Sequence, residues 1–246
     1  MELIYEGTIS KDKNHKRYEV RKLVLGDLTD ILQVQEQVVH HLTDKGVLQP
    51  LTKEEFQYIL EGNGLMIGAY VSEELIAFRA LLAPPIDEEH LGRDFGMMEN
   101  ELSEVIYQEI SNVLPAYRGN KLQQTLATLI MEELNKQESP YRYVCCTVAP
   151  FNIPSLKDKF AQGMEIVALK EKYGGQLRYI FVKELSVVDA SPWQEIQIIE
   201  MNDIASQQGI IAKGWRGFKM EEQEGKQLVF YGSKHNRKAA IASELL

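Results

Sequence analysis

What this 246-residue sequence lacks narrows the classes to which it can belong. It has only two cysteines, Cys145 and Cys146, which are adjacent and therefore neither pair without strain nor give the spacing of a zinc site. It has no long uncharged apolar run of the kind that forms a transmembrane helix. Its first residues lack the apolar core of a signal peptide. We therefore expect a cytoplasmic protein with no disulfide framework and no bound metal ion.

Basic charge is also in short supply. The chain has 27 lysines and arginines against 36 aspartates and glutamates, a formal net charge of -9. Such a balance disfavours nucleic acid and anionic membranes as partners, because both carry negative charge. The hydrophobic content of 44% is enough for one full core and an additional segment.

The most informative stretch runs from Val105 to Leu134. Its first part, to Leu114, is rich in β-branched and apolar residues and predicts a strand. Pro115 ends that strand, since proline cannot donate to a ladder. After a short turn, leucines and an isoleucine recur from Leu122 on at the spacing of an amphipathic helix. The stretch therefore predicts a strand, a turn and a helix.

The turn predicts a phosphate site. Asn120 is the expected N-cap of the helix, and Gln123 follows at the capping-box position. A helix N-terminus offers free N–H groups and a partial positive charge, to which Arg118 and Lys121 add full charges. The Gly-Lys-Ser/Thr run of a P-loop and the spaced glycines of a Rossmann turn are absent, so those two nucleotide-binding motifs are set aside.

The run V-x-P-x-Y-R-G from Val113 to Gly119, followed by the helix, resembles the pyrophosphate loop of the GNAT superfamily of N-acetyltransferases. The family pattern has Arg or Gln and then glycines three and five positions later. Arg118 matches, whereas the two glycine positions hold other residues. The resemblance implies acetyl-CoA as cosubstrate, bound at Val113, Arg118, Gly119, Asn120, Lys121, Leu122 and Gln123.

A second region resembles the closing half of the same family. A predicted strand, Tyr141 to Val148, precedes Asn152 and Ser155, and a short predicted helix ends at Gly163. In GNAT proteins the Asn and the small residue three positions on lie along the pantetheine arm. A tyrosine seven positions after the Asn commonly protonates the departing thiolate. Lys159 occupies that position here, and the resemblance places it with Asn152 and Ser155 beside the cofactor.

Together the two regions predict an α/β GNAT fold, a mixed central sheet flanked by helices, over residues 1–185. Thr52 and Glu55 predict a capping box that opens a helix from Lys53 to Leu60. The polar connection from Ile86 to Leu102 either runs over the acceptor cleft or crosses the surface, and we favour the surface crossing.

Residues 186–246 predict a small βαββ appendage. The pattern gives a strand at Trp193–Glu200, a helix at Asn202–Gln208 stopped by Gly209, and two strands at Ile210–Met220 and Gln227–Tyr231. So short a segment holds no core alone. It is expected to pack on the main domain or on a second subunit, which leaves a homodimer open.

For the chemistry, Glu109 on the predicted central strand is the candidate general base. The alternative is that its side chain faces solvent or pairs with a lysine. No cysteine or serine has the paired base that a covalent intermediate needs, so we expect direct transfer in a ternary complex.

The function predicted is transfer of an acetyl group from acetyl-CoA to a primary amine, with a small-molecule acceptor favoured by the negative net charge. The missing glycines and tyrosine favour a rival: a non-catalytic GNAT-fold module that binds or senses acyl-CoA. A third interpretation is a structural or toxin-partner protein whose appendage mediates association.

Overall fold

The computed structural model describes residues 2–11, 14–42, 46, 48–185 and 192–233. The chain forms two compact units. Unit 1 comprises Met1–Pro85 and Ile106–Pro140, and unit 2 comprises Ile86–Val105 and Tyr141–Leu246. The expected division at residue 185 falls inside unit 2. No helix in the described ranges is long and apolar enough to cross a membrane.

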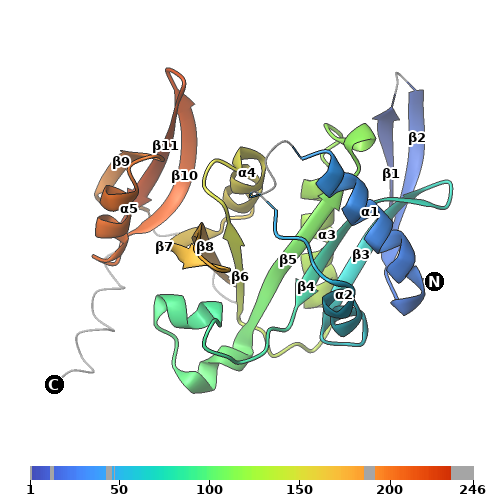
Figure 1. Ribbon diagram of the computed structural model, residues 1–246, viewed down its shortest axis with the longest axis horizontal. Helices are drawn as coiled ribbons and strands as arrows, with labels where there is room; N and C mark the ends of the chain where they lie inside the picture. The colour runs from blue at the N-terminus through green and yellow to red at the C-terminus, as the bar shows by residue number, and fades with distance from the viewer. Residues whose placement is uncertain (1, 12–13, 43–45, 47, 186–191, 234–246) are drawn as a thin grey trace. The chain divides into compact units, whose positions relative to one another are not determined.

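Unit 1 is built on antiparallel strands that follow one another in the order of the sequence (Figure 1). They are β1 (Leu3–Lys11), β2 (Asn14–Lys22), β3 (Gly64–Val71), β4 (Glu74–Leu82) and β5 (Val105–Val113). The helices are α1 (Leu28–His40), α2 (Lys53–Leu60) and α3 (Leu122–Asn135). The 3₁₀ turn η1 (Leu25–Asp27) leads into α1.

Helices cover both faces of this sheet, with α1 and α2 in front of the strands and α3 behind them in Figure 1. The coverage explains why β3 and β4 are almost wholly buried and consist largely of apolar residues rather than alternating ones. Phe56 of α2 meets Phe78 of β4 edge to face at 5.7 Å between ring centroids. On the α3 side, Leu126 and Ile130 are fully buried.

Unit 2 is also antiparallel in every registered strand pair, in the order β6-β8-β7-β10-β11-β9. Its strands are β6 (Tyr143–Val148), β7 (Glu165–Lys172), β8 (Gln176–Glu184), β9 (Ile196–Glu200), β10 (Arg216–Gln223) and β11 (Lys226–Gly232). Its helices are α4 (Ile153–Ala161) and α5 (Ile204–Ile211).

The C-terminal segment has the order β9-α5-β10-β11, and it docks on β7 and β8 of the same chain. Gly217 of β10 pairs with Ile166 of β7, and a Cβ on Gly217 would lie 2.9 Å from the Ile166 Cδ1 atom. The fully buried Gln207 accepts hydrogen bonds from the hydroxyls of Tyr179 at 2.7 Å and Tyr231 at 2.8 Å. One polar side chain thus joins α5, β8 and β11.

Several expected bounds in this segment are wrong, and those around Gly209 have a clear physical reason. Helix α5 does not stop at Gly209 but runs to Ile211, because Gly209 keeps an ordinary helical conformation and Ile210 is buried. The turn out of the helix is made by Gly214, whose φ of +85° suits glycine. The following strand therefore begins at Arg216 and not at Ile210.

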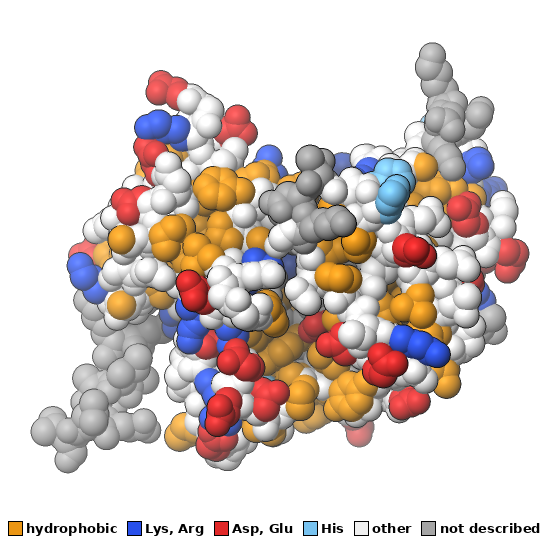
Figure 2. Space-filling model, viewed as in Figure 1, with side chains coloured by type: hydrophobic (Ala, Val, Ile, Leu, Met, Phe, Trp, Pro, Cys, Tyr) orange, Lys and Arg blue, Asp and Glu red, His pale blue; other side chains and the backbone are white. Residues whose placement is uncertain are grey.

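The connection after Pro85, for which we favour a surface crossing, has regular structure of its own. It forms two 3₁₀ helices, η3 (Leu91–Phe95) and η4 (Glu99–Glu104). Asp94 in η3 lies 2.5 Å from the Lys170 Nζ atom and 3.2 Å from that of Lys172, both on β7. On the face shown in Figure 2, acidic and basic side chains are interspersed, with hydrophobic ones between them.

Candidate active site

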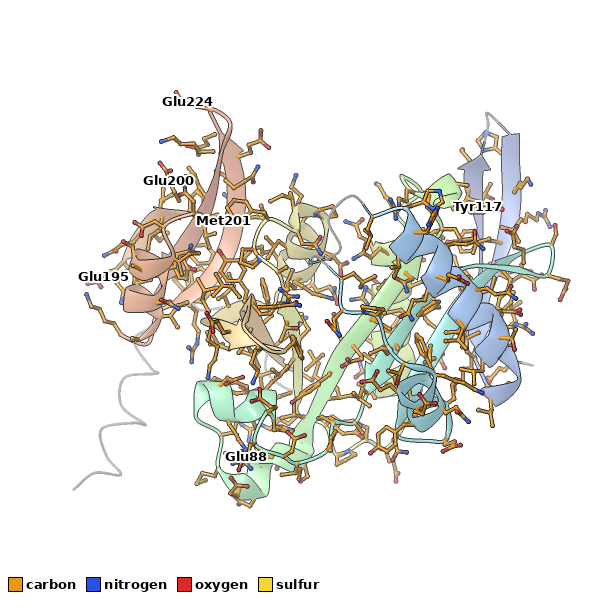
Figure 3. The ribbon with its side chains drawn as sticks, viewed as in Figure 1. Glu88, Tyr117, Glu195, Glu200, Met201 and Glu224 are labelled. Carbon is orange, nitrogen blue, oxygen red and sulfur yellow. The ribbon has the colours of Figure 1, made fainter. Side chains whose placement is uncertain are left out.

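The turn between β5 and α3 is the first part of the candidate site. Val113 ends β5 opposite Ala77, and the 3₁₀ turn η5 (Pro115–Tyr117) follows. Tyr117, labelled in Figure 3, is buried, and its hydroxyl donates to a Glu74 carboxylate oxygen at 3.2 Å. Arg118 and Lys121, on either side of the turn, are exposed. Packing of Tyr117 therefore fixes the start of a turn whose two cations face solvent.

Asn120 is not the N-cap that the pattern predicts. The N-cap is Lys121, α3 starts at Leu122, and no side chain caps the helix, so Gln123 closes no capping box. Asn120 is engaged elsewhere: its side chain bonds to both backbone groups of Ser10 and to the carbonyl of Tyr117. Asn120 therefore bonds to Ser10, 110 residues away in the sequence, instead of to the first amides of α3.

Lys121 adopts the left-handed conformation, with φ of +59° and ψ of 15°. This region favours glycine, and a side chain held there costs about 1–2 kcal/mol. The first glycine of the GNAT pattern falls on this same position. Lys121 therefore holds a backbone conformation that glycine adopts readily. Gln123, at the second glycine position, lies in the first turn of α3, where any residue is conformationally allowed.

The start of α3 presents backbone donors. The first N–H groups of a helix have no acceptor within it. In α3 the amide of Thr125 donates to the Lys121 carbonyl at 2.9 Å. In the described part of the chain, the amides of Leu122 and Gln123 before it donate to no protein acceptor. These groups and the exposed cations make the turn suited to a di-anionic phosphate group.

Arg79 supports the turn from the sheet, and the sequence patterns above did not single it out. It lies on β4, only 1% of it is exposed, and its Nη1 donates to the Gln123 carbonyl at 3.2 Å. Its Nη2 donates to the Gln108 Oε1 at 2.7 Å. The sequence contained a signal: Arg79 lies in the middle of a strand whose one other charged residue is Glu74 at its start, and a charge within an apolar run is costly unless it is paired.

Glu109, the candidate base, sits in a bulge of β5. Ala80 pairs with Ile110 and Leu81 pairs with Gln108, which leaves Glu109 opposite no residue of β4. Such a bulge redirects a side chain and is common beside active sites. Although the residue as a whole is half-buried, desolvation of its carboxyl group, aided by the negative charge of Glu55, raises the pKa of Glu109 to about 7. The charge that acts on it comes from a carboxylate, which argues against pairing with a lysine.

Unit 2 holds the other residues expected at the cofactor, on α4. Asn152 caps this helix, and its Oδ1 accepts from the Ser155 amide at 3.4 Å. Lys159, one turn further on, is buried, and its Nζ lies 3.3 Å from the Asp158 Oδ2. The structure thus groups Asn152, Ser155 and Lys159 on one short helix. Glu109, Val113 and the Arg118–Gln123 turn are grouped in unit 1.

Nucleophilic thiol chemistry finds little support. Cys145 and Cys146 are buried, and burial, with the nearby Cys146, raises the pKa of the Cys145 thiol well above its usual range. The reactive thiolate is therefore disfavoured at Cys145. Within the described ranges, no three His, Cys, Asp or Glu side chains cluster as metal ligands would.

Comparison with solved structures identifies the fold. No protein-family model and no curated protein matches the sequence. Solved structures do match. An N-acetyltransferase from Staphylococcus aureus Mu50 has a TM-score of 0.53 at 14% identity, over 69% of this chain and 99% of its own. The chain has the GNAT fold.

Two further structures agree. NAA60 of Arabidopsis thaliana in complex with acetyl-CoA has a TM-score of 0.55 at 17% identity, over 69% of this chain and 99% of its own. A GNAT-family acetyltransferase from Streptococcus pneumoniae has a TM-score of 0.53 at 15% identity with the same coverage. The GNAT fold expected from two short motifs is thus confirmed. At these identities the likeness concerns the fold, and function depends on the site itself.

Proposed function

We propose that this protein is an N-acetyltransferase that transfers an acetyl group from acetyl-CoA to a primary amine of a small-molecule acceptor. The observation that carries the proposal is the β5–α3 turn: Lys121 keeps a glycine-like backbone, and α3 starts with free amides beside Arg118. The complex of NAA60 with acetyl-CoA, on the same fold, supports acetyl-CoA as the cosubstrate.

In this proposal Arg118, Lys121 and the first amides of α3 bind the pyrophosphate. Gly119, Asn120, Leu122 and Gln123 shape that turn, and Val113 lies at the end of the strand that leads to it. Asn152, Ser155 and Lys159 on α4 lie along the pantetheine arm. These assignments follow the GNAT pattern position by position.

The acceptor must arrive at the thioester as a free amine. A carboxyl group with a pKa near 7 is well matched to take a proton at neutral pH, so Glu109 acts as the general base, directly or through a water molecule. The amine nitrogen then attacks the thioester carbon, and the C–S bond breaks to release the CoA thiolate. A backbone N–H near the β5 bulge is the proposed donor to the developing oxyanion.

Lys159 stands where GNAT enzymes commonly have a tyrosine. Its buried position beside Asp158 lets it stabilise or protonate the leaving thiolate. The same substitution favours the alternative function, a GNAT-fold module that binds acyl-CoA without turnover. Binding with no thiol release from any amine would select this alternative.

The remaining assignments follow from charge and packing. The acidic balance favours a small-molecule amine in the cytoplasm over nucleic acid or membrane. We propose residues 1–185 as the acetyltransferase domain and residues 186–246 as an appendage docked on it in cis. A homodimer is the alternative use of the appendage.

The test is calorimetric titration with acetyl-CoA, followed by a thiol-release assay over a panel of amines. Arg118→Ala is expected to weaken acetyl-CoA binding by about 1.5–3 kcal/mol, the range for a hydrogen bond to a charged group. Lys157→Ala, which removes an exposed cation on α4, is the matched control. An unchanged dissociation constant in Arg118→Ala would remove the pyrophosphate assignment.

A further inference from the structure

The N-terminal hairpin of β1 and β2 contacts the proposed pyrophosphate turn through one side chain. The Ser10 amide donates to the Asn120 Oδ1 at 2.8 Å, and the Asn120 Nδ2 donates to the Ser10 carbonyl at 3.0 Å. The same Nδ2 donates to the Tyr117 carbonyl at 3.0 Å. Asn120 therefore ties the turn to β1 and to the residue that begins the turn.

The register of β1 shows that Ser10 is free to make this contact. Ser10 is opposite His15 in the antiparallel pair with β2. In such a pair the N–H and C=O of one residue point to the same side. Since both groups of Ser10 bond to Asn120, they face away from β2. The outer edge of β1 therefore receives the turn.

The conformation of the turn shows what the contact between Asn120 and Ser10 stabilises. Asn120 lies between Gly119, with φ of +84°, and Lys121, with φ of +59°. A left-handed residue with a side chain persists only when its surroundings hold it there. Thr125 anchors the Lys121 carbonyl on the helix side, and Asn120 fixes the other side. Without that hold, the turn has a cheaper right-handed alternative, which would redirect its amides.

We infer that Asn120 is a positioning residue, which locks the pyrophosphate turn onto the edge of β1 and makes the N-terminal hairpin a functional part of the acetyl-CoA site. This inference rests on the proposed function. It also corrects the expected role of Asn120: its amide group is already engaged by Ser10 and Tyr117, so it acts on the cofactor through the backbone of the turn.

Two variants remove the contact from opposite sides. Asn120→Ala removes all three hydrogen bonds. Ser10→Pro removes the N–H that donates to Asn120, and an edge strand tolerates proline where its N–H faces outward. Ser10→Ala is the matched control, because it keeps the backbone donor and deletes only the hydroxyl, which contacts the His15 ring at 3.3 Å.

Binding of CoA is measured by calorimetry, and binding of S-acetyl-pantetheine by NMR titration. The second probe lacks the pyrophosphate. Asn120→Ala, which loses three hydrogen bonds, and Ser10→Pro, which loses one, are each expected to raise the dissociation constant for CoA about 5- to 30-fold. Affinity for S-acetyl-pantetheine stays unchanged in both. The double variant loses no more than the larger single effect, since both changes break one contact. Ser10→Ala binds like the unchanged protein.

Three results overturn the inference. The first is that Asn120→Ala binds CoA within twofold of the unchanged protein while Arg118→Ala loses much of its affinity. Asn120 would then not position the turn, and the proposed function would still hold. An equal loss for both probes, with a lowered melting temperature, shows a general structural role instead. Failure of the unchanged protein to bind CoA removes the proposed function and the inference together.

Discussion

Glu109 on β5 and Glu133 on α3 are two glutamates of unit 1 with opposite surroundings. Desolvation, with the charge of Glu55, raises the pKa of Glu109 to about 7. Glu133 is also desolvated, which alone would raise its pKa, but Lys136 at 2.5 Å and Lys22 at 3.0 Å lower it. One carboxyl group is ready to exchange a proton at neutral pH, and the other is fixed as an anion. Burial raises the pKa of Glu109 because no cation of the described residues opposes it there, whereas at Glu133 the two lysines outweigh burial.

The largest expected effect is on turnover, from a mutation of Glu109. Glu109→Gln removes the base and should lower turnover about 10²- to 10⁴-fold, the usual contribution of general acid–base catalysis. Thiol release with the best amine of the panel measures it. Stability should not fall, because the glutamine avoids a partly desolvated charge. Turnover close to that of the unchanged protein would mean that an ordered water or another group takes the proton.

The pH dependence follows from the same pKa. In the unchanged protein, the rate should rise about tenfold per pH unit below 7 and level off above it, because only the ionised Glu109 accepts a proton. Glu109 should also make folding less favourable as pH rises from the ordinary carboxyl pKa through 7, since the folded state holds its proton longer. A rate that is flat between pH 5.5 and 7 would contradict this assignment.

A smaller effect is expected at Glu133, on stability and not on turnover. Glu133→Gln removes the partner of two lysines and should lower the free energy of unfolding by about 1–2 kcal/mol at pH 7. Because the folded-state pKa is lowered, the ion pair stabilises above the ordinary carboxyl pKa and is lost as pH falls through the lowered one. Denaturant unfolding measures the change, with the exposed neighbour Glu132→Gln as the control. A loss of turnover without a loss of stability would reverse the comparison.

The smallest expected effect tests how much the charge of Glu55 contributes to the raised pKa of Glu109. Glu55 closes the capping box of α2: its Oε2 accepts from the Thr52 amide at 2.7 Å. Glu55→Gln keeps that hydrogen bond but removes the charge. The midpoint of the pH–rate profile should fall by less than about one unit, because desolvation is the larger cause. A midpoint that falls to the ordinary carboxyl value would make Glu55 the main cause instead.

Local patterns predicted what depends on neighbours in sequence. The strand, turn and helix around Arg118, the capping box at Thr52 and the short helix before Gly163 all lie where the sequence places them. Each of these depends on contacts within a few residues. The β-branched and apolar residues from Val105 to Leu114 also placed Glu109 on the right strand, but the bulge that isolates it depends on the register with β4.

The features that were missed depend on distant partners. Asn120 looks like a local cap, and only the folded chain brings Ser10 to it. Gly209 looks like a helix stop, yet the burial of Ile210 carries α5 past it. Arg79 was overlooked because the Gln123 carbonyl that it supports lies on a later helix. In each case a contact with a residue distant in the sequence decides the outcome, and local sequence patterns do not reveal such contacts.

The placement of β10 beside β7 has a consequence for how the chain is made. Strand β7 is synthesised some 50 residues before β10 pairs with it, and until then its outer edge has no partner from the C-terminal segment. At about 5–20 residues per second, that interval lasts about 2–10 seconds on the ribosome. Open strand edges can pair with strands of other chains. The Tyr179 hydroxyl also lacks its acceptor, Gln207, until α5 has been synthesised. The C-terminal segment therefore closes a strand edge that has been open since β7 was made, so nascent chains halted before β10 should be the ones that chaperones hold.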